Sequence, residues 1–315
     1  MLNTIVLLML STLVLSSGAP GCHAKQNAAL PTQTPNTEAS TKALKVLGEG
    51  FHSAITHPFI AVIRDALTYA ELMKLDNALP KLDAEFFKSN AVIAAYLGTR
   101  NTGGYSVEIS FGASGRWATG QGDGSLNRPQ TKGFVLIQSK APGKGVMVPQ
   151  MITSPFKVVS LEVNPTDNIM VASDYIWQQT MRRYRIASGT FKMSGGFAGT
   201  TEQFRLTGDL RILMREGNLA TFFIFLLNAD PAKKQRSLND FTTGVVGADG
   251  RLTINKLTAG SLVDAPNSGL RVSGAFGSGG SKISLVFNSL PTTVADGYHG
   301  EGTLEAELVD SGSKP

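Results

Sequence analysis

The stretch AVIAAYLGTRNTGGYSVEISF, residues 91–111, contains the clearest strand signals in the chain. Residues 91–97 are apolar throughout, which indicates a buried strand. Residues 105–111 alternate with a period of two, so every second side chain lies on the same face. Gly103 and Gly104 lie just before the second run, and glycine adopts the positive φ that tight turns need. The stretch therefore predicts a β-hairpin.

Upstream of this hairpin, the sequence predicts a strand followed by one helix. Residues 59–63 (FIAVI) read as a short buried strand. Thr68 and Glu71 match a capping box, in which the threonine oxygen accepts a backbone N–H and the glutamate reaches back. Apolar residues then recur on one face up to Leu79, and Pro80 ends the predicted helix.

Downstream of the hairpin, the pattern is that of short strands. The runs 133–139, 145–152 and 156–163 come first, and residues 164–168 (NPTDN) form a candidate domain boundary. Beyond it, β-like runs recur roughly every ten residues, which is the spacing of a sandwich or a barrel. These later runs are 184–193, 203–213, 220–227, 251–257, 270–276, 282–287 and 302–309. Asp249-Gly250 is a hairpin turn signal between them.

The predicted fold is therefore mainly β, in two domains. Residues 46–165 form a small α+β or β-sandwich-like unit with one helix. Residues 168–315 form a β-rich domain of unknown type, an antiparallel β-sandwich or barrel.

The N-terminus predicts export. An 11-residue apolar run, Ile5 to Leu15, is shorter than the about 20 residues that cross a bilayer, and it fits the core of a signal peptide over residues 1–21. Ala19-Pro20-Gly21-Cys22 resembles a lipoprotein lipobox. That resemblance implies cleavage before Cys22 and a diacylglyceryl thioether on its sulfur. The alternative is ordinary cleavage near Ala19 or Ala24, which would leave a free exported thiol.

Residues 22–45 are predicted to be a disordered tether. They are rich in Ala, Thr, Asn, Gln and Pro, without an apolar period, and so cannot bury enough surface to offset the entropy of ordering. A flexible chain of ~20 residues spans roughly 25 Å on average. The mature protein is thus expected on the outer side of the cytoplasmic membrane or at the outer membrane, held by a lipid anchor.

Composition and motifs argue against several classes of function. The chain has 29 Lys and Arg against 24 Asp and Glu, but no basic block and no nucleic-acid-binding motif. It contains no H-E-x-x-H, G-x-S-x-G or P-loop pattern, and its four histidines are scattered. We therefore expect no catalytic residue, no cofactor, no metal and no nucleic-acid partner. A carboxylate hydrolase stays open, because sequence alone cannot pair two acids across a cleft.

Residues 82–109 resemble the C-terminal domain family of the protease complex subunit PrcB. The family pattern is an Asp-Phe element, an apolar strand ending in glycine, and T-G-G-Y-S-V-E-I; here two residues separate Asp83 from Phe86. Val148–Phe156 is similar to a later Pro-containing strand and Thr-x-Pro-aromatic element, so the likeness covers roughly residues 55–163. It implies a lipoprotein-type accessory protein that associates with a surface protease. Asn101–Tyr105 is also similar to a loop of chagasin-type cysteine-protease inhibitors.

These observations predict a non-catalytic exported lipoprotein that acts as a protein-binding accessory subunit of a protease or envelope complex. A protruding tip would present polar groups, with a tyrosine as anchor, since Tyr and Arg are favoured at interfaces. The candidate contact residues are Arg100, Asn101, Thr102, Gly103, Gly104 and Tyr105. Alternatively, the glycines only make the turn and Tyr105 packs in the core. Two further hypotheses are a direct protease inhibitor acting through hairpin loops, and a C-terminal barrel that binds a small apolar ligand.

Overall fold

The computed structural model describes residues 44–113, 133–163, 167–174, 177, 181–195, 200–212, 216–260, 262–263, 268–295 and 297–310. All of them belong to one compact unit, Ala39–Pro315. Cys22, the predicted signal peptide and all but the last two residues of the predicted tether lie outside the described residues. The first strand begins at Lys45, the last tether residue.

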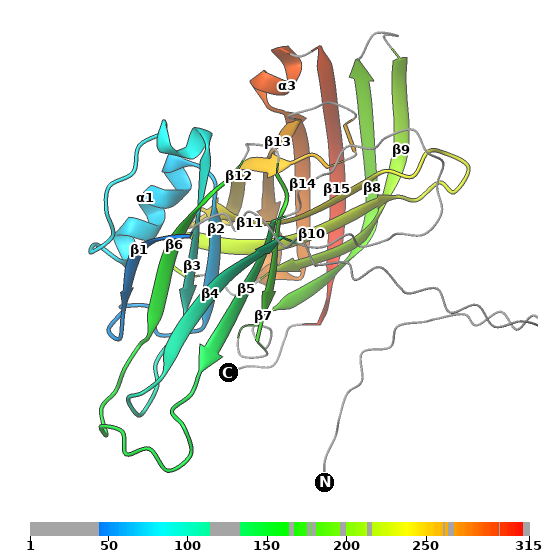
Figure 1. Ribbon diagram of the computed structural model, residues 1–315. Helices are drawn as coiled ribbons and strands as arrows, with labels where there is room; N and C mark the ends of the chain where they lie inside the picture. Colours follow the sequence, from blue (N-terminus) through cyan, green and yellow to red (C-terminus); the bar gives the residue numbers. More distant parts are fainter. Residues whose placement is uncertain are drawn as a thin grey trace, which may run out of the picture. The chain divides into compact units, whose positions relative to one another are not determined.

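A four-stranded antiparallel sheet forms the centre of the N-terminal region (Figure 1). Its strands, in spatial order, are β1 (Lys45–Gly50), β6 (Phe156–Glu162), β3 (Asn90–Tyr96) and β2 (Phe59–Ile63). Every residue of β2, and every residue of β3 after the first, is buried. Both faces of these strands are covered, which is why their sequences are unbroken apolar runs.

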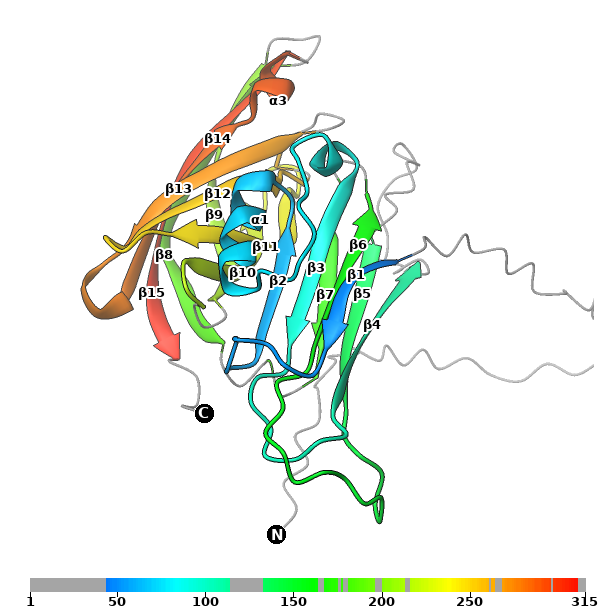
Figure 2. The ribbon, with the colours of Figure 1, turned by 90° about the vertical axis from the view of Figure 1, so that its left-hand side faces the viewer.

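The two faces of this sheet pack against different layers. On one face, Tyr69 and Leu72 of helix α1 (Ala66–Leu75) join a core with Val92 (Figure 2). On the other face, a second sheet packs, ordered β4 (Ser106–Ala113), β5 (Gly133–Lys140) and β7 (Ile169–Ser173). Ile93 of β3 and Ile137 of β5 share that second core. The predicted α+β, sandwich-like unit with one helix is confirmed in this arrangement.

Helix α1 is confirmed, but its predicted cap is wrong. Asp65 is the N-cap, and its carboxylate accepts hydrogen bonds from the backbone N (2.9 Å) and the hydroxyl (2.7 Å) of Thr68. Thr68 therefore lies inside the first turn as a donor, because aspartate three residues earlier offers a stronger acceptor at the positive end of the helix. Glu71 instead binds Lys74 and Asn218. The helix ends at Leu75, before the predicted stop.

The predicted hairpin over residues 91–111 is also wrong, although both of its strands exist. Strand β3 pairs with β2 and β6, whereas β4 pairs with β5 in the other sheet. Because β3 is apolar on both faces, it takes a central position between two strands. Strand β4 alternates, and only its Val107 and Ile109 face enters the core. Residues 97–105 thus carry the chain from one sheet to the other.

Strands β8 to β15 form a closed antiparallel barrel. Each strand pairs with its neighbours in sequence, and β15 closes the barrel on β8. The strands are β8 (Arg182–Gly195), β9 (Thr200–Ile212), β10 (Leu219–Asn228), β11 (Ser237–Val246), β12 (Arg251–Thr258), β13 (Gly269–Phe276), β14 (Lys282–Ser289) and β15 (Tyr298–Asp310). A short helix, α3 (Pro291–Ala295), precedes β15. Of the two predicted architectures, sandwich or barrel, the structure has the barrel.

The barrel interior is one continuous apolar core. Phe191, Phe222 and Phe287 are among its fully buried side chains. The outer face carries cross-strand ion pairs such as Arg183–Asp209 and Lys282–Glu307. This division between an apolar inside and a charged outside follows the alternation of side chains along each strand.

Three strands escaped the sequence analysis, and one predicted strand is absent. Strands β1, β7 and β11 were not predicted, and residues 145–152 have no regular strand. Strand β7 follows directly on the predicted boundary at 164–168 and pairs in parallel with β5. The N-terminal sheets therefore extend to Ser173, and the barrel begins at Arg182. A division into two separately folding domains stays a prediction.

Candidate functional site

The predicted contact residues lie in a pair of braced loops. We call residues 97–105 and 141–155 the paired loops; they lie beyond the lower ends of the sheets in Figures 1 and 2. Arg100 N donates to Thr153 O (2.7 Å), and Thr153 N donates to Arg100 O (2.9 Å). Gly103 N donates to Pro149 O (3.0 Å), and Thr153 Oγ1 donates to Thr102 O (3.1 Å). Each loop therefore fixes the backbone of the other.

Arg100 supports these loops and does not form the tip predicted for it. Its Nη2 donates to the carbonyl of Leu97 (2.8 Å), and its Cζ lies 5.8 Å from the ring centroid of Tyr105. The side chain is half-buried, and its Nε has no hydrogen-bond partner among the described residues. Burial lowers the pKa of the Arg100 guanidinium, and the neighbouring Tyr105 opposes that shift. Asn101, by contrast, is exposed.

The two predicted glycines serve different purposes. Gly104 has φ +83°, and a Cβ there would lie 2.8 Å from Val148 Cγ1. Gly103 does not have positive φ, but a Cβ on it would lie 3.3 Å from Pro149 Cδ. Gly104 thus supplies a backbone conformation, whereas Gly103 permits the close approach of the second loop.

Tyr105 is half-buried and packs against the core between the two sheets. It also supports the Arg100 guanidinium on its ring. The side chain therefore combines a core position with a role in bracing the loops, and only part of it is open to a partner.

Residues 146–152 carry exposed apolar side chains that their sequence pattern does not predict. Met147 is 98% exposed and Ile152 is 69% exposed, and Val146 and Met151 are also exposed. Phe51, whose carbonyl accepts a hydrogen bond from Ser154 N (2.7 Å), is exposed too. Four exposed apolar side chains within seven residues of one loop are a candidate interaction site. An apolar run was read as a strand; Pro149, which lacks a backbone N–H, was the available signal against that reading.

The charge of the paired loops is one-sided. Arg100 and Lys144 are the only charged residues in the two segments, and neither segment contains Asp or Glu. Two carboxylates of nearby strands are engaged by other cations: Glu49 pairs with Lys157 (2.9 Å) and Glu108 with Lys140 (2.6 Å). A third, Asp174, accepts hydrogen bonds from Ser139 N (2.6 Å) and Oγ (2.9 Å) at the end of β5. The two loops themselves therefore carry apolar side chains and positive charge.

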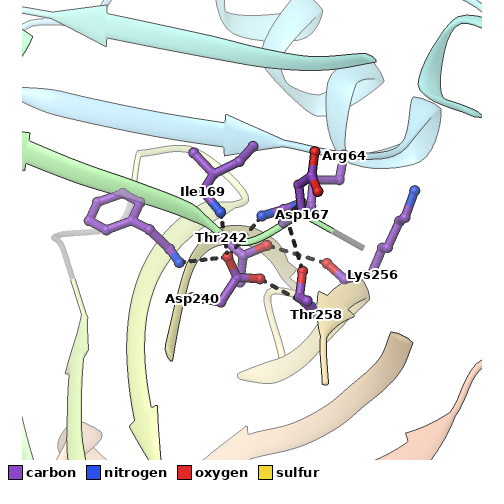
Figure 3. A network of polar contacts seen from close by, with 8 residues as sticks. Arg64, Asp167, Ile169, Asp240, Thr242, Lys256 and Thr258 are labelled. Atoms are coloured by element: carbon purple, nitrogen blue, oxygen red, sulfur yellow. Dashed lines mark hydrogen bonds and ion pairs between the residues drawn. The ribbon is translucent and has the colours of Figure 1, made fainter. Parts of the chain in front are cut away.

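A second polar cluster lies where the N-terminal region meets the barrel (Figure 3). Asp240 of β11 is fully buried, and its carboxylate accepts from Arg64 Nη2 (2.8 Å) and from the backbone N of Thr258 (3.1 Å). The backbone N atoms of Ile169 (3.3 Å) and Phe241 (3.0 Å) donate to it as well. Four donors from different parts of the chain thus converge on one carboxylate.

This cluster closes a seam in the barrel. Strands β11 and β12 pair only at Val245–Thr253 and Val246–Leu252, so their remaining residues are not joined by a ladder. Asp240 bridges the gap to Thr258, and Arg64 reaches in from the end of β2. Burial raises the pKa of Asp240, while Arg64 and the three backbone donors oppose the rise. Asp240 is fully buried and takes its hydrogen bonds from the chain itself, so we interpret the network as a structural joint.

The described residues contain no group of three or more His, Cys, Asp or Glu side chains arranged to hold a metal ion. No helix in the described part of the chain is long and apolar enough to cross a membrane.

Comparisons with known proteins add no function. No protein-family model matches the chain, and no curated protein matches it. One solved structure is similar, a structural-genomics protein of unknown function from Bacteroides ovatus. The two share 11% identity, and the likeness covers 85% of this chain and 97% of the other, with a TM-score of 0.30. A likeness at that level carries no argument about this chain.

Proposed function

We propose that this chain is a non-catalytic, protein-binding accessory subunit, exported and anchored through Cys22, that docks on its partner through the paired loops. The observation that carries this proposal is the set of exposed apolar side chains on a braced loop. Removing apolar surface from water is worth about 25 cal/mol per Å², so these side chains would stabilise a complex that covers them.

The bracing of the loops supports the same proposal. Ordering a flexible loop on binding costs conformational entropy, which subtracts from affinity. Here hydrogen bonds join Arg100 and Gly103 to Thr153 and Pro149, so this part of the second loop is held before any partner arrives. The ordering that these bonds supply lowers the cost of binding.

The partner class comes from the resemblance of residues 55–163 to the PrcB family, which favours a surface protease or another envelope complex. Direct inhibition of that protease is an alternative consequence of the same contact. The two are separated by adding the purified chain to the protease: an accessory subunit leaves peptide hydrolysis unchanged, whereas an inhibitor abolishes it.

The apolar-ligand hypothesis for the barrel also stays a prediction. The large aromatic side chains that fill its interior favour a packed core over a ligand site. Extraction of the purified protein with organic solvent, followed by mass spectrometry, tests this point. Recovery of one lipid-like compound in molar proportion to the protein would favour ligand binding.

The central experiment is copurification from native membranes of the full-length protein and a Met147→Asp/Ile152→Asp variant. We expect a stoichiometric partner with the unmodified chain and at least about a tenfold loss with the variant, because a buried unpaired carboxylate is costly. Leu67→Asp and Val294→Asp are matched controls, because these apolar side chains are 71% and 49% exposed away from the loops. Equal recovery of the partner by all variants would contradict the proposed surface.

A further inference from the structure

We infer that the partner presents an apolar recess rimmed by carboxylates, into which residues 146–152 insert. This inference rests on the proposed function and names the chemistry of the partner. It follows from two properties of the paired loops, the side chains that they expose and the sign of their charge.

The exposed side chains fit a recess better than a flat surface. Met147 is 98% exposed, so nearly all of its side chain is free to enter a cavity on another protein. Methionine is unbranched and polarisable, which lets it fill irregular apolar gaps. Val146 and Ile152, which are stiff at χ1, lie on either side of it in sequence and offer fixed contacts around that flexible one.

The positive charge of the loops indicates that the rim of the partner's recess is negatively charged. Lys144 is exposed two residues before Val146, and Arg100 lies half-buried in the facing loop. Neither loop contains a carboxylate, and the nearby Glu49 and Glu108 already pair with Lys157 and Lys140. Asp174, at the end of β5, accepts hydrogen bonds from Ser139. A partner with carboxylates around its recess would therefore be attracted, whereas a basic partner would be repelled.

A protein fits these features better than an anionic bilayer. Recognition of anionic lipid typically uses clusters of 4–8 Lys or Arg, each worth about 1 kcal/mol near the surface. The paired loops contain two cations, and one of them, Arg100, lies over the ring of Tyr105. The loops are also held together at Pro149 and Thr153, which suits a surface of complementary shape that a fluid bilayer does not offer.

Site-specific photo-cross-linking tests the inference in the full-length protein. A benzophenone amino acid replaces Met147, and in a second chain it replaces Val294 as a control at a distant exposed site. After irradiation of native membranes, we expect a protein adduct from position 147 that is absent from position 294. Mass spectrometry of the cross-linked peptide should place Asp or Glu beside an apolar segment of the partner.

Charge reversal supplies the second readout. We expect Lys144→Glu to lower the cross-link yield at position 147 at least about fivefold, while Lys144→Arg retains it. Raising NaCl from 50 to 500 mM should also lower the cross-link yield at position 147 in the chain that retains Lys144, because salt screens exposed charges. Lys282→Glu, which breaks an exposed pair on the barrel, is the matched control and should leave the yield unchanged.

The outcomes separate this inference from the proposed function. The acidic rim is contradicted if the cross-linked segment of the partner lacks carboxylates, or if Lys144→Glu leaves the cross-link yield unchanged. Either result still supports binding to a protein. Lipid adducts without a protein adduct overturn both and assign the surface to the bilayer. Equal yields from positions 147 and 294 overturn the proposed surface itself.

Discussion

The guanidinium of Arg64, in the seam of the barrel, and that of Arg100, in the paired loops, have different surroundings. In the seam, Arg64 is buried and paired with Asp240, and backbone donors complete the carboxylate. In the paired loops, Arg100 rests on a carbonyl and an aromatic ring, with no acid in either loop. The seam pairs its guanidinium with a buried carboxylate, although the Nε of Arg64, like that of Arg100, has no hydrogen-bond partner among the described residues. The loops have no such carboxylate and leave apolar side chains exposed.

The largest effect should come from breaking the seam. Asp240→Leu removes the acceptor and leaves Arg64 buried without its counter-charge, which we expect to cost about 3–5 kcal/mol of the free energy of unfolding. Urea unfolding followed by the fluorescence of buried Trp177 and by circular dichroism would measure the loss.

The double variant Arg64→Met/Asp240→Leu is the control for that prediction. It removes both charges and should recover part of the loss, although the backbone N atoms of Ile169, Phe241 and Thr258 stay without their acceptor. A double variant no more stable than Asp240→Leu would show that the carboxylate acts through the backbone and not through Arg64.

The second largest effect should come from Tyr105, and it tests how much the paired loops contribute to the stability of the hydrophobic core. Tyr105→Ala removes a half-buried ring and the surface on which Arg100 rests, so we expect a loss of about 2 kcal/mol, less than for a fully buried aromatic. Thermal unfolding measures it, and Tyr105→Phe, which retains the ring, should lose little. If Tyr105→Ala lowers the free energy of unfolding as much as Asp240→Leu does, the loop is part of the hydrophobic core. The proposed difference between the two regions would then be wrong.

The third effect separates the two adjacent glycines. Gly104→Ala places a Cβ in the left-handed region at a cost of about 1–2 kcal/mol, in addition to contact with Val148. Gly103→Ala needs only a small shift of Pro149 and should cost about 0.5 kcal/mol, as modest crowding does. Equal melting temperatures for the two variants would show that φ at Gly104 is not constrained by the fold.

Local patterns were enough to predict most strands but not how they pair. Strand β3 was found because its apolar run is unbroken, whereas strands of the barrel such as β14 were found because apolar and polar residues alternate along them. Strand β11 was missed because Asp240 and Thr242 interrupt its apolar pattern, and the partner that explains Asp240 lies 176 residues away. The same limit applies to the loops. The pattern of residues 100–105 marked a candidate contact segment, which stays a prediction, yet their bracing by Pro149 and Thr153 depends on contacts that no local pattern contains.

The smallest effects on stability should appear within the candidate surface, and they separate support from contact. Arg100→Ala loses the hydrogen bond to Leu97 and the contact with the Tyr105 ring, but it also removes a half-buried charge. We therefore expect the free energy of unfolding to fall by about 1 kcal/mol. Asn101→Ala and Met147→Ala alter exposed side chains and should stay within about 0.5 kcal/mol of the unmodified protein.

A thermal melt measures the stability of each variant, and copurification measures its binding to the partner. If Met147 makes the contact, Met147→Ala weakens binding while melting as the unmodified chain does, and Arg100→Ala weakens binding only as far as it loosens the loops. Normal binding by Met147→Ala together with reduced binding by Asn101→Ala would move the contact from the second loop to the first.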